Sequence, residues 1–562
     1  MSEFPKASYD DWRKLVEKDL KGAPFDQKML TPLCEGIILQ PVYRAEDAAK
    51  LPYINSLPGF APYVRGTRAA DHKGRVWEIS QEIDCASASE FNNQARNSLA
   101  SGLNALNVVL DKATRNGNDP DWAKPGEVGA SGLSIATLGD LEHALEGINL
   151  KDISLYVRSG ASGMPFAALL IALLRRRKQR ASCLRGCIEI APLGVLSHEG
   201  VLPQSLDCAY REMAALTGWA AERAPQLQTI CVHSRSWHES GGDPVQELAF
   251  TLATGVEYLR EMNKRGLDVE LVAPRIRFAV TVGANFFPEI AKLRALRMLW
   301  ARAVSAIGGS EDAQRLSLHV RTSLWNKTAR DPHNNILRTT VEAFAGVLGG
   351  CDSMQVGAFD EVIRRPDDFS RRIARNTQLI LQKECNITHV IDPAGGSWYV
   401  EKLTSELASH AWTLFQEVEK MGGMAAALQA GFPQKAVAAT AAKKIEAAKA
   451  KTITIVGVNN YINPKPVTLE VPVADTAPFY KRRVQQVASH RMALEDAAGD
   501  LVLKKLSSIV SRPGSKLFAE CVEAAEAGAT LGEIVRALRI HDRPGTPITP
   551  VCLTRLAADL EK

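Results

Sequence analysis

Eight short runs rich in apolar and β-branched residues recur along this chain at nearly even spacing. They begin near Leu106, Ile153, Cys187, Gln228, Ile276, Leu316, Ser353 and Thr388, and neighbouring starts lie 34 to 48 residues apart. Most intervals contain one stretch with helical periodicity. This alternation of strand and crossover helix predicts an α/β fold, a closed (β/α)8 TIM barrel. An open, doubly wound sheet is the rival architecture, but the repeats show no reversal of order.

The expected strands are Leu106–Leu110, Ile153–Val157, Cys187–Ile190, Gln228–His233, Ile276–Val282, Leu316–Val320, Ser353–Val356 and Thr388–Ile391. Helical stretches are clearest over Pro244–Asn263, Phe287–Ala306 and Asp360–Lys383. In such a barrel the functional side chains lie on the loops that follow the strands. Those loops are therefore the place to look for chemistry.

At 562 residues the chain is too long for one simple core, and we expect four regions. Residues 1–60 form an N-terminal arm, with a short amphipathic helix followed by several prolines, that packs on a neighbouring domain or subunit. A frayed terminus is the alternative. Residues 61–400 form the barrel, 401–466 a helical linker and 467–562 a mainly helical appendage.

Composition excludes several classes of protein. The net charge is only +5, and no aromatic residues alternate with the basic ones, so we expect no nucleic-acid partner. No apolar stretch reaches the ~20 residues of a membrane span, and the first residues lack a signal sequence. Ten dispersed cysteines do not complete a metal site and indicate reduced thiols in the cytoplasm.

The most polar loop follows the fourth expected strand and runs from His233 to Asp243. His238 beside Glu239 could form an acid–base pair, or His238 could be a hydrogen-bonded residue that holds the loop. After the eighth expected strand, Asp392 could be a ligand or the cap of a turn. The glycines that follow could admit a cofactor or only allow a tight turn. These residues alone indicate a barrel enzyme, or an enzyme-like subunit, with a polar mouth.

Several ordered segments resemble the methylmalonyl-CoA mutase family, the adenosylcobalamin-dependent acyl-CoA mutases. They are Glu247–Phe250, Gly255–Arg260, Ala284–Phe287, Glu289–Ala295, Asp331–Asn335, Leu337–Thr340, Arg375–Ile380 and Asp392–Glu401. The resemblance implies an acyl-CoA that threads the barrel axis and a separate cobalamin domain over the ends of the strands. It also implies a radical rearrangement of the acyl skeleton by a 1,2 shift, in which the cofactor carries the chemistry.

The resemblance also implies site residues. Candidates for binding substrate or CoA are Arg65, Arg68, Arg75, Gln81, Arg235, Asn285 and Arg321, and Gln355 and Glu384 would face the cofactor. If this chain is itself catalytic, the candidates are Glu82, Ser236 and His238. No residue is expected to bind a metal.

This sequence departs from the family pattern at the positions closest to the chemistry. Glu82 stands where catalytic relatives have a tyrosine, and Ser236 stands where they have a histidine. The segment that carries their substrate-binding arginine is not found. The Asp-x-His-x-x-Gly motif that would ligate cobalt is also absent, so we expect no intact cobalamin-binding domain. If Glu82 faces a closed interior, it should pair with a cation such as Arg235 or be protonated.

Three hypotheses follow. The first is that this chain is the structural small subunit of a heterodimeric mutase, whose homologous large chain binds adenosylcobalamin and acts on methylmalonyl-CoA or succinyl-CoA. The alternative is the substrate barrel of an unusual acyl-CoA mutase, with cobalamin on a separate small protein. The third is a regulatory or assembly protein that inherited the fold.

Overall fold

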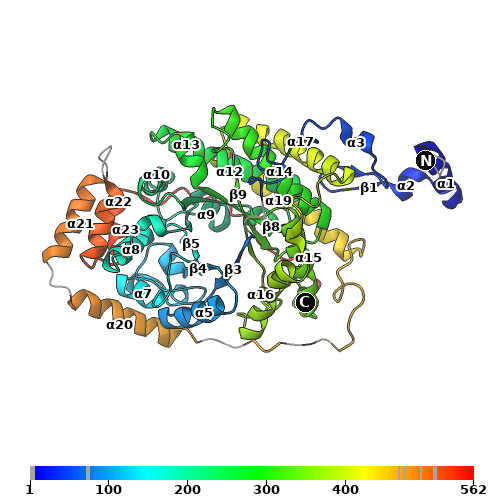
Figure 1. The fold of residues 1–562 in the computed structure, drawn as a ribbon. Coiled ribbons are helices and arrows are strands. Elements are labelled where there is room, and N and C mark those ends of the chain that lie inside the picture. The colour runs from blue at the N-terminus through cyan, green and yellow to red at the C-terminus, as the bar shows by residue number, and fades with distance from the viewer. Residues whose placement is uncertain are drawn as a thin grey trace.

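Eight parallel strands close into a barrel surrounded by helices (Figure 1). The structure is a computed structural model that describes residues 7–70, 76–465, 467, 469–471, 475–493, 497–510 and 516–561. The strands are β3 (Glu78–Ile83), β4 (Ala105–Val109), β5 (Ser154–Arg158), β6 (Gly186–Ile190), β7 (Leu227–His233), β8 (Ile276–Val282), β9 (Ser317–Thr322) and β10 (Ser353–Gln355). Their order around the barrel follows the sequence, and β10 pairs with β3 to close it. The predicted TIM barrel is confirmed.

Seven of the eight strand predictions agree with the structure, and the eighth is wrong. The run Thr388–Ile391 forms no strand, because Ile387–His389 is a 3-10 turn outside the barrel. The missing strand is β3, which precedes all the predicted ones and pairs with β4 and β10. Strand β3 was not predicted because its inward side chains are Glu78, Ser80 and Glu82, so its sequence lacks the apolar pattern of the other strands.

The helices that cover the barrel are α5 (Ala88–Ala100), α7 (Leu138–Ala144), α8 (Gly163–Arg176), α10 (Leu206–Arg223), α12 (Pro244–Lys264), α14 (Phe286–Ala306), α15 (Asn334–Leu348) and α16 (Asp368–Lys383). Shorter helices in the connections are α6 (Lys112–Arg115), α9 (Pro192–Glu199), α11 (Arg235–His238) and α13 (Val269–Val272). Local sequence explains their starts: at α12, the Asp243 side chain accepts a hydrogen bond from Gln246 N, and Pro244 takes the first helical position.

The N-terminal residues form α1 (Tyr9–Asp19), α2 (Phe25–Met29), the β1–β2 hairpin (Thr31–Pro32 and Ile38–Leu39) and α3 (Ala45–Ala49). In Figure 1, α1 and α2 project away from the barrel. No residue of α1 is buried, although Ser8 caps the helix through a capping box. Its Trp12 packs edge-on against Phe25 of α2, with ring centres 6.2 Å apart, but the helix remains largely exposed.

The stretch expected as a linker contains α17 (Trp398–Lys420), α18 (Met424–Gln429) and α19 (Phe432–Lys449). Helix α17 packs against α12 and α14, and its Leu403 and Leu407 belong to the main hydrophobic core. The C-terminal part holds α20 (Ala477–Ala493), α21 (Ala497–Ile509), α22 (Leu517–Glu526) and α23 (Leu531–Leu538). Helix α22 packs on α8 at one side of the barrel, as Figure 1 shows.

After α23 the chain forms an extended C-terminal strap, residues 545–556, across loops that follow the barrel strands. Val551 N donates to Ser197 O after β6, Thr554 N to Glu239 O after β7, and Leu556 N to Trp325 O after β9. These three bonds, of 2.8 to 3.0 Å, link the strap to loops that follow three different barrel strands. The strap therefore fixes the mouth of the barrel.

All ten cysteines are free thiols, in agreement with the sequence analysis. Within the described part of the chain, no helix is both long enough and apolar enough to cross a membrane.

A buried cluster of two arginines and two carboxylates ties the end of the arm to the helical layer. Arg294 of α14 pairs with Asp392 and, at 2.9 Å, with Glu401 of α17. Arg65 pairs with the same two carboxylates at 3.0 and 3.1 Å. The side chains of Arg294 and Glu401 are fully buried. Two charges of each sign compensate each other here, so removal of one should leave an unpaired buried charge.

We therefore expect Arg294→Gln to lower the free energy of unfolding by about 3–5 kcal/mol. Urea unfolding followed by circular dichroism measures the change. The control is Arg302→Gln on the same helix, because Arg302 is exposed and only stacks on Trp412. The control should lose less than about 1 kcal/mol. Equal effects of the two substitutions would contradict this assignment.

Candidate functional site

The interior of the barrel is polar, in contrast to the layers of Val, Ile and Leu that fill most TIM barrels. The guanidinium of Arg277 lies 3.5 Å from the centre of the Tyr156 ring, and the Tyr156 hydroxyl donates to Glu78 at 2.6 Å. His319 packs beside Tyr156 with ring centres 6.2 Å apart, and its Nδ1 lies 2.9 Å from Ser353 Oγ. These side chains come from β3, β5, β8, β9 and β10. We call Glu78, Tyr156, Arg277 and His319 the axial plug.

Glu82 lies above the plug, at the end of β3, among cations. Its carboxylate is 3.4 Å from Arg321 and 3.9 Å from Arg158, and Arg321 also pairs with Glu361 at 2.9 Å. Burial opposes the charged form, but Arg321, then Arg158 and Arg235, lower the pKa of Glu82 to about 2. Glu82 does pair with cations, as expected for a closed interior, but directly with Arg321 and Arg158 rather than with Arg235.

The space left above the plug is a cavity of about 50 Å³. It is lined by Glu82, Asn107, Val108, Val109, Tyr156, Arg158, Glu189, His233, Arg235, Arg277, Ala279, Val280, Thr281, His319 and Arg321. Pockets that bind cofactors and drug-sized ligands usually measure about 300–1,000 Å³. The axis of this barrel is therefore filled by its own side chains.

His238 is hydrogen bonded on both ring nitrogens. Nδ1 lies 2.9 Å from Glu247 and Nε2 lies 3.0 Å from Ser323 Oγ. Lys292 Nζ also donates to Glu247 at 2.6 Å, so the carboxylate of Glu247 binds both Lys292 and His238. The Ser323 side chain is fully buried. A serine, a histidine and a carboxylate in this order resemble a nucleophilic triad, but the buried serine is not exposed to solvent, and these hydrogen bonds fix the loop in place.

The other two loop residues singled out by the sequence are also bound to neighbours. Glu239 does not pair with His238; its carboxylate accepts a hydrogen bond from Leu324 N at 2.9 Å. Ser236 Oγ accepts a hydrogen bond from Ser197 Oγ at 3.0 Å and is nearly buried. Ser236 nevertheless lines a hollow next to the axial cavity. The expected acid–base pair of His238 and Glu239 is therefore not formed.

Most of the residues expected to bind CoA lie away from the axial cavity. Arg65 belongs to the buried cluster with Asp392 and Glu401, and Arg68 pairs at 2.7 Å with Asp352, which precedes β10. Gln81 points outward, because side chains alternate along a strand, and donates to Arg371 O of α16 at 2.9 Å. Arg75 lies outside the described residues.

Two more candidates are exposed. Asn285 stands at the N-terminus of α14. Glu384 follows α16. Gln382, in the last turn of that helix, donates a hydrogen bond to Trp77 O just before β3. Because crossover helices run antiparallel to the strands, Glu384 lies at the end of the barrel opposite the mouth. It is therefore far from any cofactor that would cover the mouth.

Gln355 is at the mouth, where its Oε1 accepts a hydrogen bond from Glu82 N at 2.8 Å. Asp392 is held by Arg65 and Arg294.

Sequence reasoning missed the residues that actually fill the interior. Tyr156, Arg158, Arg277, His319 and Glu361 were not singled out. A signal was present in the strands themselves. Charged or aromatic residues two apart, such as Tyr156 and Arg158, mark the inward face of a strand whose other residues are apolar.

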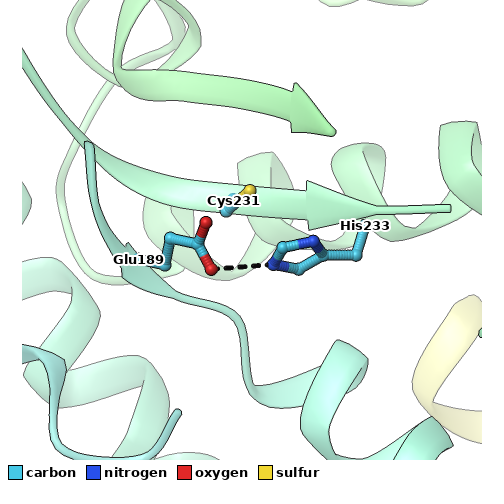
Figure 2. Close-up of side chains that lie close together, drawn as sticks. All are labelled: Glu189, Cys231 and His233. Carbon is cyan, nitrogen blue, oxygen red and sulfur yellow. Dashed lines mark hydrogen bonds and ion pairs between the residues drawn. The ribbon is translucent and has the colours of Figure 1, made fainter. Parts of the chain in front are cut away.

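Glu189, Cys231 and His233 form a group that could offer three metal ligands, since their ligand atoms lie within 4.8 Å of one another. Figure 2 shows the Glu189 carboxylate facing the His233 ring at 2.9 Å, with Cys231 two residues before His233 on β7. A thiol must lose its proton to bind a metal. Burial, then Glu189 and Cys187, raise the pKa of Cys231 well above its ordinary value. We assign no metal to this group.

Comparison with known proteins identifies the family. A sequence profile described as methylmalonyl-CoA mutase matches residues 33–543. The chain belongs to the methylmalonyl-CoA mutase family. A methylmalonyl-CoA mutase of Rhizobium meliloti is 37% identical over 532 residues, 94% of this chain and 74% of that protein. A methylmalonyl-CoA mutase large subunit of Streptomyces virginiae is 36% identical over 95% of this chain and 74% of its own length.

The human mitochondrial methylmalonyl-CoA mutase is also similar, with 33% identity over 94% of this chain and 71% of its own length. Family members are mutases, a class of isomerase, so the family resemblance stated from the sequence is confirmed. Members of this family use adenosylcobalamin, and the residues at the mouth can be tested for their fit to it.

The histidines next to the axial cavity do not fit a cobalt ligand. His238 uses both ring nitrogens, and His233 Nε2 is bonded to Glu189. Burial, then Arg235, Arg158 and Arg115, lower the pKa of His198 to about 4, so this imidazole is neutral but surrounded by cations. These cations would repel a metal ion. These three histidines therefore do not fit a cobalt ligand, and we route no chemical step through the cofactor.

The pKa of Glu82 predicts a pH-dependent stability. Since the folded value lies below the ordinary value of about 4.3, ionised Glu82 stabilises the fold above about pH 5, and this contribution is lost as the pH falls toward 2. Glu82→Gln should lower the free energy of unfolding by about 2–3 kcal/mol at pH 7 and by less than half of that near pH 3. Urea unfolding of both proteins at pH 7 and at pH 3 measures these changes in the free energy of unfolding. The exposed Glu384→Gln is the control, and a pH-independent effect of Glu82→Gln would contradict the assignment.

Proposed function

We propose that this chain is the structural, small-subunit-type barrel of an adenosylcobalamin-dependent mutase that acts on methylmalonyl-CoA or succinyl-CoA. The main observation in support of this proposal is the axial plug. A family member that binds substrate must admit an acyl-CoA along the barrel axis. Here Tyr156, Arg277 and His319 occupy that axis and leave a cavity of about 50 Å³, which supports a barrel that does not admit the acyl group and its thioester.

The residues at the mouth support the same proposal. Glu82 stands where catalytic relatives have a tyrosine, and its carboxylate is held by Arg321 and Arg158. A charged group that is fixed by two cations offers no apolar wall to a radical intermediate, and removing it from those cations would be costly. Ser236, at the position of the family's histidine, is bonded to Ser197 rather than free to reach a thioester carbonyl.

The N-terminal arm supports a partner. Helices α1 and α2 stand clear of the barrel in Figure 1, and the apolar side chain of Leu15 on α1 is 62% exposed. An amphipathic helix with an uncovered apolar side gains stability when it packs on another surface. We propose that this surface belongs to a homologous catalytic chain, which carries the adenosylcobalamin.

Two measurements test the proposal. The first is calorimetric titration of the purified chain with CoA and with methylmalonyl-CoA, with the Rhizobium meliloti mutase as the positive control. We expect no binding to this chain, because the plug fills the axis. Stoichiometric acyl-CoA binding would overturn the structural role.

The second measurement is affinity purification of the tagged chain from its native cell, followed by assays for cobalamin and mutase activity. We expect a homologous chain to co-purify and to hold the cofactor. Recovery of activity with only a small cobalamin-binding protein would instead establish this barrel as the substrate chain. Recovery without any mutase would favour a regulatory or assembly protein.

A further inference from the structure

A second hollow lies beside the axial cavity, where β4, β5, β6 and β7 end. Its volume is about 60 Å³. Three arginines reach it from three different connections: Arg115 follows β4, Arg158 ends β5, and Arg235 follows β7. His198 of α9 lines it as well. Cationic side chains thus converge on one small space from separate parts of the chain.

The carboxylates around this hollow do not balance the arginines. Glu189 and Glu199 are the acidic residues of its lining. Glu189 is hydrogen bonded to His233 at 2.9 Å, and nearby Glu82 is closer to Arg321 than to Arg158. Glu82 is thus shared between Arg158 and Arg321, and Glu199 is the one remaining carboxylate of the lining. The lining therefore carries an excess of positive charge in a partly buried place.

Unpaired donors and lowered pKa values of the arginines agree with this excess of positive charge. The Nε atoms of Arg115 and Arg235 are buried and have no hydrogen-bond partner among the described residues. Arg158, then burial and Arg321, lower the pKa of Arg235 to about 10. Burial and then Arg158 also lower the pKa of Arg115. Buried donors without acceptors are costly, and a negative ligand would satisfy them.

We propose that this hollow binds one small free oxyanion, a carboxylate or a phosphate, between Arg115, Arg158 and Arg235. Guanidinium groups bind both kinds of anion through paired N–H donors, so the chemistry of the site is shared by the two sources. A space of about 60 Å³ is far smaller than the about 300–1,000 Å³ of pockets that bind cofactors and drug-sized ligands. It accommodates a small charged group and excludes a nucleotide or a CoA.

The bound anion would join loops that otherwise repel one another. It would connect the segments after β4 and β7 with the end of β5, and so stiffen the mouth beneath the C-terminal strap. This role does not depend on whether the barrel is catalytic or structural. Since the anion binds the folded chain, it should raise the unfolding temperature in proportion to its occupancy.

The test compares the unfolding temperature of the chain in potassium chloride, potassium acetate and potassium phosphate at equal ionic strength. We expect a saturable rise over chloride in acetate, in phosphate or in both. A rise confined to acetate identifies a carboxylate ligand, and a rise confined to phosphate identifies a phosphate ligand. Unfolding temperatures that match chloride in both salts would overturn the proposal.

Two substitutions locate the effect. Arg235→Gln should abolish the rise, and in chloride it should not lower the unfolding temperature, because it removes a charge that its neighbours repel. Arg315→Gln is the matched control, since Arg315 is half-exposed before β9 at the opposite end of the barrel. Arg115→Gln is the second site variant if Arg235→Gln does not fold. An anion response that survives in a folded site variant, or is lost in the control, would place the anion elsewhere and overturn the assignment.

Discussion

The stack of Arg277 on Tyr156 is the interaction on which the interior of this barrel depends. A cation lies against the face of an aromatic ring whose hydroxyl is bonded to Glu78, so the three groups satisfy one another within a space closed to water. Each comes from a different strand, β8, β5 and β3. Because the plug is bonded across the barrel, its charges compensate one another and the barrel can close around polar side chains.

The family architecture and the local chemistry of this chain point in different directions. The identity with mutases extends over most of the chain, and β3 closes the eight-stranded barrel. The side chains at the axis and mouth, in contrast, are engaged with each other. Glu82 with Arg321 and His238 with Glu247 form an ion pair and a charged hydrogen bond that leave those groups fixed. Positions that would face a ligand instead stabilise the fold.

The sequence predicted the barrel because seven strands have apolar outward faces that pack on helices. It missed β3 because Glu78, Ser80 and Glu82 break the apolar pattern, and it placed a strand at Thr388–Ile391 because those residues are β-branched but have no partner to pair with. The site was less predictable. Which residues face the axis depends on strand register, and whether Arg65 binds a ligand or Asp392 depends on a contact between residues more than 300 positions apart.

The C-terminal strap has a consequence for how the molecule is made. Val551, Thr554 and Leu556 bind loops that follow β6, β7 and β9, yet they are synthesised after all the strands of the barrel. Domains begin to fold during synthesis, from the N-terminus onward. The strands and helices of the barrel can therefore assemble first, before the strap that binds three of its loops has been made. A nascent chain that stalls before residue 551 would hold a closed barrel with an unfinished mouth.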